Sequence, residues 1–140
     1  MTSFTTHSEE ETISIGKQFA SSLKGDEVIG LSGDLGAGKT QFTKGLCNFF
    51  GLNKSVISSP TFSIVNEYPG STPIFHFDFY RIENEKELWD IGIEDYFSLS
   101  GIKIIEWYEL APNVLPENMI KVKIEINEDD SRLITITRQD

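Results

Sequence analysis

The sequence has 140 residues, which is enough for one domain with a substantial core, and its formal net charge is −10. Proteins that grip nucleic acid alone usually present a basic face, so 12 basic against 22 acidic residues disfavour that function. The acidic surface suits docking onto a basic protein, or it serves only solubility. No apolar run approaches the roughly 18 residues that cross a membrane, so no membrane attachment is expected.

The amino terminus carries no basic segment followed by an apolar core, so no secretory signal peptide is predicted. Cys47 is the only cysteine, and no disulfide can form within the chain. These features favour a cytoplasmic protein. No internal repeat or long linker divides the sequence, and we predict a single domain over residues 1–140.

The first predicted helix follows two overlapping capping signatures, at residues 6–9 and 8–11, in which a Ser or Thr precedes an acidic residue by three positions. Ile15, Phe19 and Leu23 then recur at the four-residue spacing of one helix face. The pattern predicts a helix that runs to Leu23 and is ended by the Lys-Gly-Asp segment after it.

Residues 33–40, with the sequence Gly-Asp-Leu-Gly-Ala-Gly-Lys-Thr, match the phosphate-loop pattern G-x-x-x-x-G-K-[ST]. Glycines let backbone N–H groups face an anion, Lys39 supplies a positive charge for the β- and γ-phosphates, and Thr40 offers a hydroxyl to Mg²⁺. The predicted nucleotide-binding residues of this segment are Gly33, Gly36, Ala37, Gly38, Lys39 and Thr40.

The flanking segments give this motif the context it requires. Residues 27–32 form a short apolar run rich in β-formers, and residues 40–50 carry aromatic and aliphatic residues at helical spacing before Gly51, which suits a helix end. Strand, glycine-rich turn and helix are therefore all predicted, which favours a nucleotide loop over a turn that binds nothing.

The next segment, residues 58–62, is polar and contains a proline. Residues 63–68 and 74–78 read as two strands, and the Pro- and Gly-rich turn at 69–73 between them predicts a hairpin. A short helix is expected at residues 85–91, where Gly92 closes it.

Three further strands complete the predicted elements. Residues 102–106 form an apolar strand that ends in an acid, and residues 120–126 and 133–136 alternate as a hairpin with one wet face. The order of elements predicts an α/β layered fold of the P-loop NTPase type, with a mixed, mainly parallel sheet flanked by helices and antiparallel hairpin additions.

A phosphate loop needs an acid for the magnesium shell, and such acids lie at the ends of buried strands. Asp78 and Glu106 each end an apolar strand, at the edge where open α/β sheets bind ligands. One would anchor the metal and the other would orient or deprotonate the attacking water, although either could instead cap a helix. We interpret His76 as a packed strand residue and Cys47 as an inert buried thiol.

The chain resembles the TsaE family, the ATPase subunit of the bacterial tRNA threonylcarbamoyladenosine pathway. The resemblance covers nearly the whole length and rests on the phosphate loop together with more specific motifs. These motifs are Ser59-Pro60-Thr61-Phe62, Val65-Asn66-Glu67-Tyr68, His76-Phe77-Asp78-Phe79-Tyr80-Arg81 and Ile105-Glu106-Trp107.

The resemblance implies an ATPase that uses ATP and Mg²⁺ and joins the proteins TsaB and TsaD. These two form the threonylcarbamoyl transferase that modifies adenosine 37 of tRNAs reading ANN codons, so tRNA would be reached only through the complex. Hydrolysis would be weak alone and stronger in the complex, and it would support repeated turnover of the partners.

The resemblance also implies roles for single residues. Residues 36–40 would hold the phosphates, Thr40 and Glu106 would hold Mg²⁺, and Asp78 and Lys39 would serve hydrolysis. Ser59 and Thr61 would lie on a switch-like loop that senses the γ-phosphate or a partner, or form an ordinary turn.

The resemblance also bears on four further positions. Thr6 and Arg132 would flank the nucleobase, and Trp107 would contact nucleotide or partner, or only pack the site. Arg81 would pair with a phosphate, a partner's acid or a surface acid. Tyr108 stands where the family usually has proline, a departure that leaves the rigidity of this turn open.

Two other functions remain as alternatives. A small-molecule kinase uses the same loop, but such kinases usually carry an arginine-rich lid, and this sequence has three arginines and no lid-like insertion. A nucleotide-gated binding module would switch its partners without needing turnover.

Overall fold

The computed structural model describes residues 1–34, 36–53, 57 and 64–138. Within these residues the strands form one seven-stranded sheet in the order β1-β7-β6-β2-β5-β4-β3. The strands are β1 (Thr2–Thr6), β2 (Val28–Gly33), β3 (Val65–Tyr68), β4 (Ile74–Asp78), β5 (Ile102–Glu106), β6 (Ile120–Ile126) and β7 (Arg132–Thr137). The helices are α1 (Glu9–Ala20), α2 (Lys39–Phe49), α3 (Lys86–Asp90) and α4 (Ile93–Ser98), with the 3₁₀ turns η2 (Tyr108–Leu110) and η3 (Pro112–Val114).

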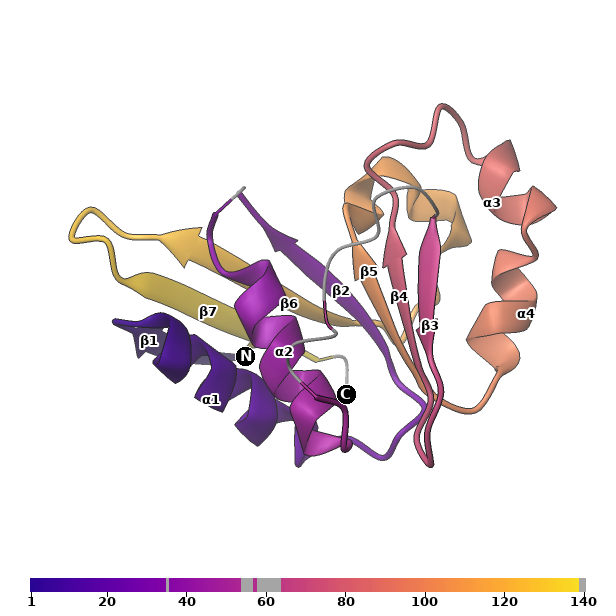
Figure 1. Ribbon diagram of the computed structural model, residues 1–140. Helices are drawn as coiled ribbons and strands as arrows, with labels where there is room; N and C mark the ends of the chain where they lie inside the picture. Colours follow the sequence, from indigo (N-terminus) through magenta and orange to yellow (C-terminus); the bar gives the residue numbers. More distant parts are fainter. Residues whose placement is uncertain (35, 54–56, 58–63, 139–140) are drawn as a thin grey trace.

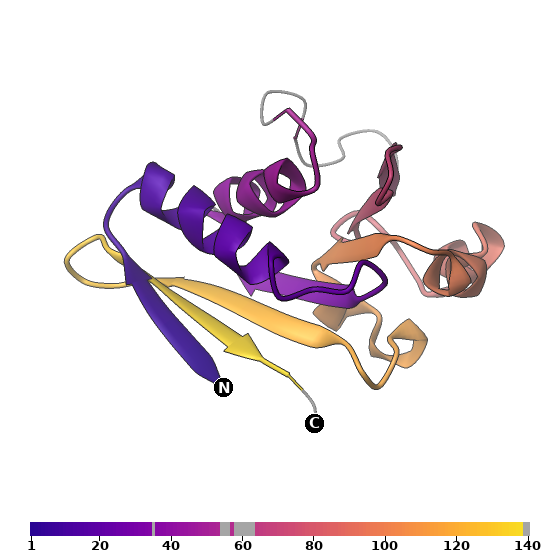
Figure 2. The ribbon, with the colours of Figure 1, turned by 90° about the horizontal axis from the view of Figure 1, so that it is seen from below.

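The sheet has a parallel centre and antiparallel ends. Strands β6, β2, β5 and β4 pair in parallel, whereas β7 with β6, β1 with β7, and β3 with β4 pair antiparallel. Helices α1 and α2 cover one face, and α3 and α4 lie at the β3–β4 end (Figures 1 and 2). This confirms the predicted mixed α/β layer fold and both predicted hairpins.

The core lies on both faces of the parallel centre. On the face of α1 and α2, a cluster that includes Leu31, Phe42 and Ile104 is almost fully buried. On the other face, Phe77 and Ile105 pack with residues of α3, α4 and η3. Alternate side chains of β2, β4 and β5 enter opposite clusters, which explains why these three strands read as largely apolar runs.

Helices α1 and α2 touch through their backbones. A Cβ atom built on Gly45 would lie 1.9 Å from the Ile13 carbonyl oxygen, and one on Gly16 would lie 2.2 Å from the Phe42 carbonyl oxygen. Only glycine permits this approach, so the two helices form one closely packed layer over the sheet.

The sequence prediction for the first helix was wrong at its carboxyl end. The helix begins as expected, with Ser8 as N-cap accepting from the Glu11 N–H, but it ends at Ala20 rather than at Leu23. The hydroxyls of Ser21 and Ser22 donate to carbonyls three residues back, and such side-chain bonds compete with helix continuation.

Other elements differ in extent. Strand β1 and helix α4 were not predicted, β3 begins at Val65, and residues 58–62 lie outside the described part of the chain. Strand β6 alternates buried and exposed residues as predicted for a hairpin with one wet face. No helix among the described residues is long and apolar enough to span a membrane.

Candidate functional site

The phosphate loop joins the end of β2 to the start of α2. Gly36 and Gly38 have φ angles of 83° and 113°, in the left-handed region that favours glycine, and Gly38 is the N-cap of α2. No side chain among the described residues caps this helix start. The first N–H groups of α2 are therefore available to an anion, and the helix dipole favours one there.

A cavity of about 790 Å³ opens beside this loop. Its residues come from the loop and α2, from the ends of β4 and β5, from the segment between β1 and α1, and from the β6–β7 turn. The residues that line it are Thr6, His7, Ser8, Glu9, Thr12, Asp34, Gly36, Ala37, Gly38, Lys39, Thr40, Gln41, Asp78, Tyr80, Glu106, Trp107, Asp130 and Arg132.

The deep wall of the cavity consists of Lys39, Asp78, Glu106 and Trp107. Asp78 and Glu106 end neighbouring parallel strands and are register partners, so both side chains reach the same edge of the sheet. Lys39 Nζ lies 3.8 Å from Glu106 Oε1, and these two side chains are only 10% and 4% exposed. The deep wall therefore sets one cation beside two acids, of which Glu106 is nearly buried and Asp78 is half-buried.

Asp78 is the last residue of β4, and the turn that follows holds its side chain. Its Oδ1 accepts a hydrogen bond of 2.9 Å from the Tyr80 N–H. Burial raises the pKa of the Asp78 carboxyl, and the charge of Glu106 raises it further, while the Tyr80 N–H, His76 and Lys39 lower the pKa in part. A carboxylate with a raised pKa is better suited to accept a proton near neutral pH.

Trp107 covers the lysine. Lys39 Nζ lies 4.8 Å from the ring centroid of Trp107, and the Tyr80 ring packs against Trp107 at a tilt of 43°, with 4.9 Å between centroids. Trp107 has a φ of 59°, which is uncommon outside glycine. Tyr108 follows, and its ring lies so close to Gly30 of β2 that a Cβ there would be 2.7 Å away. The packing of Tyr108 against Gly30 thus anchors this turn, although Tyr108 stands where the family usually has proline.

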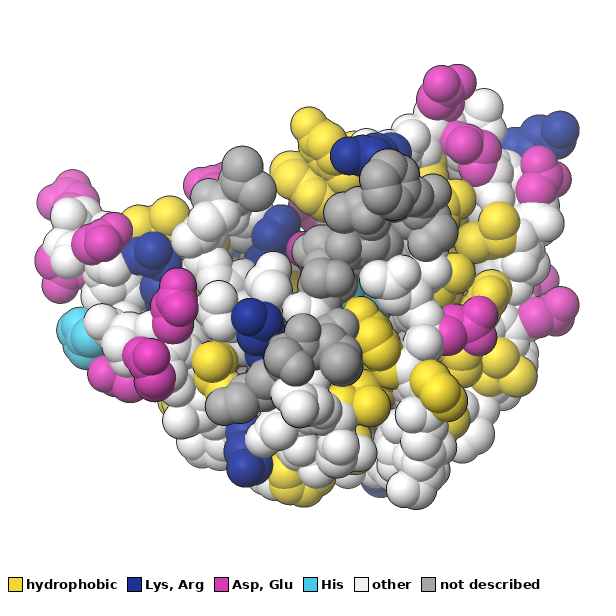
Figure 3. All heavy atoms as spheres, viewed as in Figure 1, with side chains coloured by type: hydrophobic (Ala, Val, Ile, Leu, Met, Phe, Trp, Pro, Cys, Tyr) yellow, Lys and Arg dark blue, Asp and Glu magenta, His cyan; other side chains and the backbone are white. Residues whose placement is uncertain are grey.

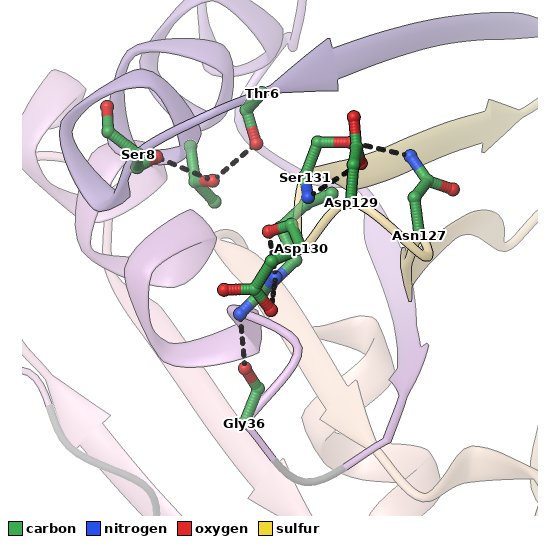
Figure 4. Close-up of polar contacts among 9 residues, drawn as sticks. Thr6, Ser8, Gly36, Asn127, Asp129, Asp130 and Ser131 are labelled. Atoms are coloured by element: carbon green, nitrogen blue, oxygen red, sulfur yellow. Dashed lines mark hydrogen bonds and ion pairs between the residues drawn. The ribbon is translucent and has the colours of Figure 1, made fainter.

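The outer wall consists of Thr6, Ser8, Asp130 and Arg132. Thr6 and Arg132 are register partners across β1 and β7, so one strand pair brings both to the rim. Arg132 Nη1 donates to the Asp130 carbonyl oxygen at 2.5 Å, and Nη2 donates to the Gly36 carbonyl oxygen at 3.4 Å (Figure 4). Arg132 therefore joins the β6–β7 turn to the phosphate loop.

Hydroxyl contacts join Thr6 and Ser8 of the outer wall through Thr12 of α1. Thr6 Oγ1 lies 2.8 Å from Thr12 Oγ1, and Thr12 Oγ1 donates to the Ser8 carbonyl oxygen (Figure 4). A Cβ at Gly38 would meet the Thr12 methyl group at 3.5 Å. Thr12, which holds Thr6, thus lies next to the phosphate loop.

The structure brings most of the predicted site residues together. Ten predicted residues line the cavity: Thr6, Gly36, Ala37, Gly38, Lys39, Thr40, Asp78, Glu106, Trp107 and Arg132. Gly33 does not line the cavity, and its Cα instead packs against the Ile124 carbonyl. Arg81 is exposed and outside the lining, and Ser59 and Thr61 lie outside the described residues.

Sequence reasoning missed several positions of the candidate site. His76 is buried on β4 as predicted, but its Nε2 lies 2.6 Å from Glu106 Oε2, a contact that its spacing did not indicate. Tyr80 and Asp130 also line the cavity. Tyr80 lies two residues after Asp78, and Asp130 lies two residues before Arg132. Closeness in the sequence to these predicted site residues was the signal that could have found them. Cys47 is buried as predicted, and burial raises its thiol pKa to about 12.

The donors present fit magnesium. No group of three or more His, Cys, Asp or Glu residues among those described could form a protein-only metal centre. Mg²⁺ needs few protein donors, since it is held by one or two protein oxygens together with substrate phosphates and waters. Thr40 and Glu106 line the same cavity and offer hard oxygen donors of this kind.

Comparisons with known proteins agree on one family. The family model described as "Threonylcarbamoyl adenosine biosynthesis protein TsaE" matches residues 6–134. A Bacillus subtilis protein named "tRNA threonylcarbamoyladenosine biosynthesis protein TsaE" is 43% identical over 129 residues, covering 91% of this chain and 80% of that protein. A Haemophilus influenzae protein of the same name is 39% identical over 137 residues, covering 94% and 85%.

A solved structure extends the likeness to the fold. The crystal structure of YdiB from Bacillus subtilis superimposes with a TM-score of 0.81 at 36% sequence identity. The match covers 98% of this chain and 84% of that one.

Proposed function

The chain belongs to the TsaE family of threonylcarbamoyl adenosine biosynthesis proteins, and on that premise we propose that it is a Mg²⁺-dependent ATPase of this pathway. It binds ATP in the cavity beside the phosphate loop. Its hydrolysis supports a threonylcarbamoyl transferase formed by TsaB and TsaD, which acts on tRNA. Contact with tRNA is indirect, and the protein works in the cytoplasm.

One observation carries the proposal. A lysine at the start of α2, a strand-end glutamate 3.8 Å from it and a strand-end aspartate in register with that glutamate all line one cavity. A phosphate loop with two strand-end acids suits phosphoryl transfer to water, because the chemistry depends on positioning and on charge stabilisation.

Each residue of the deep wall has a separate task in hydrolysis. The N–H groups at the start of α2 and the Lys39 ammonium hold the β- and γ-phosphates. Thr40 and Glu106 hold Mg²⁺, which when bound neutralises charge on the phosphates. Asp78 orients the attacking water and accepts its proton, a role that the raised pKa of its carboxyl supports.

The surface charge supports a protein partner with a basic face. The net charge is −10, and acidic side chains gather at the start of α1 and around the β6–β7 turn (Figure 3). Opposite charge on a partner would speed and orient association. Activity in a complex would therefore fall as salt rises, because salt screens exposed charges.

The test is ATP hydrolysis by this protein alone and with purified TsaB and TsaD, at matched Mg²⁺ and salt. We expect slow hydrolysis alone and marked stimulation by the pair. ATP binding without stimulation would refute the assignment of partners. The Asp78→Ala variant separates turnover from switching: if it binds ATP and still supports the modification, the protein is a nucleotide-gated switch, whereas loss of function favours hydrolysis.

A further inference from the structure

We propose that His76 is a positioning residue, which fixes the Glu106 carboxylate so that one of its oxygens stays directed to the metal. The inference rests on the proposed function, because it assigns His76 a task only if Glu106 helps to hold Mg²⁺. His76 does not line the cavity, so it acts through Glu106 rather than on the nucleotide.

The sheet places the two side chains on one face. His76 of β4 pairs in register with Ile104 of β5, and Asp78 pairs with Glu106. Since side chains alternate along a strand, His76, Asp78 and Glu106 all point to the same side. Parallel register thus sets the imidazole beside the glutamate, and both residues are almost fully buried, 1% and 3% exposed.

The two oxygens of Glu106 have different neighbours. Oε2 lies 2.6 Å from His76 Nε2, while Oε1 lies 3.8 Å from Lys39 Nζ at the cavity. The histidine contact is the short, fully buried one. It therefore prevents rotation of the carboxylate and leaves Oε1 as the oxygen that faces the site.

The hydrogen bond has a defined direction. His76 Nδ1 is buried and has no hydrogen-bond partner among the described residues. A proton on Nδ1 alone would leave a buried donor unpaired and set two acceptors face to face at 2.6 Å. The proton therefore lies on Nε2, and His76 donates to Glu106.

Packing alone does not explain a histidine here. The neighbouring residues of β4, Phe75 and Phe77, are apolar and fill the opposite cluster. Burying an imidazole costs free energy that an apolar side chain would not, unless a polar partner offsets it, and Glu106 is that partner. Residues that orient a metal ligand typically change metal affinity by about 10- to 100-fold when they are lost.

The experiment measures how strongly Mg²⁺ improves ATP binding. Calorimetry with ATP in excess EDTA and in saturating Mg²⁺ gives that gain for the wild-type protein and for His76→Phe, which keeps a ring but loses the donor. We expect His76→Phe to reduce the gain by about tenfold or more, with binding in EDTA nearly unchanged. His76→Gln, whose amide can donate to Glu106, should restore most of the gain.

Two controls separate positioning from stability. Phe77→Leu changes the adjacent buried residue on the opposite face of β4, so it should lower thermal stability and leave the Mg²⁺ gain intact. If His76→Phe does not fold, His76→Asn replaces it, because the shorter amide does not reach Glu106. In hydrolysis, the donor-free variant should need more Mg²⁺ for half-maximal rate and recover much of that rate at saturation.

The outcomes are distinct. A His76→Phe or His76→Asn protein with a wild-type Mg²⁺ gain would overturn the positioning role, even if it melts earlier. A wild-type protein whose ATP binding ignores Mg²⁺ would overturn the proposed function and this inference with it. In a Glu106→Gln background, removal of the His76 donor should have little further effect, and an additive loss would also overturn the inference.

Discussion

The two walls of the cavity are built in different ways. The deep wall is fixed by the register of β4 and β5 and by the start of α2, and its Lys39 and Glu106 side chains are nearly buried. The outer wall joins β1, the start of α1 and the β6–β7 turn. Its Arg132 reaches the phosphate loop through a long, exposed hydrogen bond to the Gly36 carbonyl oxygen. We therefore expect chemistry and phosphate affinity to depend on the deep wall, and the outer wall to adjust binding.

The largest effect should come from Asp78 of the deep wall. Asp78→Asn keeps an oxygen for the Tyr80 N–H but cannot accept a proton from water. Hydrolysis should fall by about 10²- to 10⁴-fold, the contribution typical of a general base, while ATP affinity changes little. Single-turnover hydrolysis and calorimetry measure the two quantities. A variant that retains wild-type rates would remove Asp78 from the chemistry.

Lys39→Ala should weaken ATP binding strongly. The charge-assisted phosphate contact is worth about 2–3 kcal/mol, which corresponds to roughly fifty-fold or more in affinity. Lys44→Ala is the matched control, since it removes a lysine from the same helix that does not line the cavity. Equal affinities for the two variants would contradict the placement of the nucleotide.

Gly45→Ala tests whether the walls are coupled. The added methyl would collide with the Ile13 carbonyl oxygen, so α1 must move away from α2. We expect a loss of about 1–3 kcal/mol in the free energy of unfolding, as for other overpacked sites. Because α1 carries Ser8, ATP affinity should also fall. Chemical denaturation and calorimetry on one sample distinguish the effects, and unchanged stability would mean that the helices are not in backbone contact.

Arg132→Ala should have a modest effect on binding. It removes an exposed bond to the Gly36 carbonyl, and such a bond contributes about 0.5–1.5 kcal/mol. ATP affinity should drop by a few-fold, and the hydrolysis rate at saturating ATP should stay close to that of the wild type. A loss of ATP affinity as large as that caused by Lys39→Ala would contradict the expectation that the deep wall contributes more to binding than the outer wall.

The smallest effect is expected at Glu27, outside both walls. Burial raises the pKa of its carboxyl, but hydrogen bonds from the backbone N–H groups of Lys24, Gly25, Glu27 and Asp26 outweigh burial and lower the pKa overall. A lowered pKa adds stability that is present above the unfolded-state pKa and lost as pH falls through the folded-state value.

Glu27→Gln should therefore cost about 1 kcal/mol or less at neutral pH, because the group is partly exposed. The difference in melting temperature from the wild type should shrink as the solution becomes acidic, and ATP affinity at neutral pH should not change. A difference that grows in acid would contradict the direction of the shift.

The difference between the two walls also explains which parts of the site could be predicted from the sequence. The deep wall was predictable because the phosphate loop is contiguous and because Asp78 and Glu106 end strands that are apolar on both faces. Parallel neighbours then bring such ends together. The strand limits at 74–78 and 102–106 were correct for this reason.

The outer wall depends on pairing between distant segments. Strand β1 is a polar edge strand in which only Phe4 packs against the core, so it carries no alternating apolar signal. Thr6 and Arg132 were placed by family resemblance rather than by their own pattern. The His76 contact joins two residues that lie 30 positions apart in the sequence, and it depends on the register between β4 and β5, which no local pattern encodes.

The pairing of β1 with β7 has a consequence for synthesis on the ribosome. Because β1 is made first and its partner strand near the end of the described chain, β1 cannot join the sheet until β7 has left the exit tunnel. The phosphate loop and α2 emerge long before that. A nascent chain therefore completes the outer wall of the cavity late, after β7 has emerged.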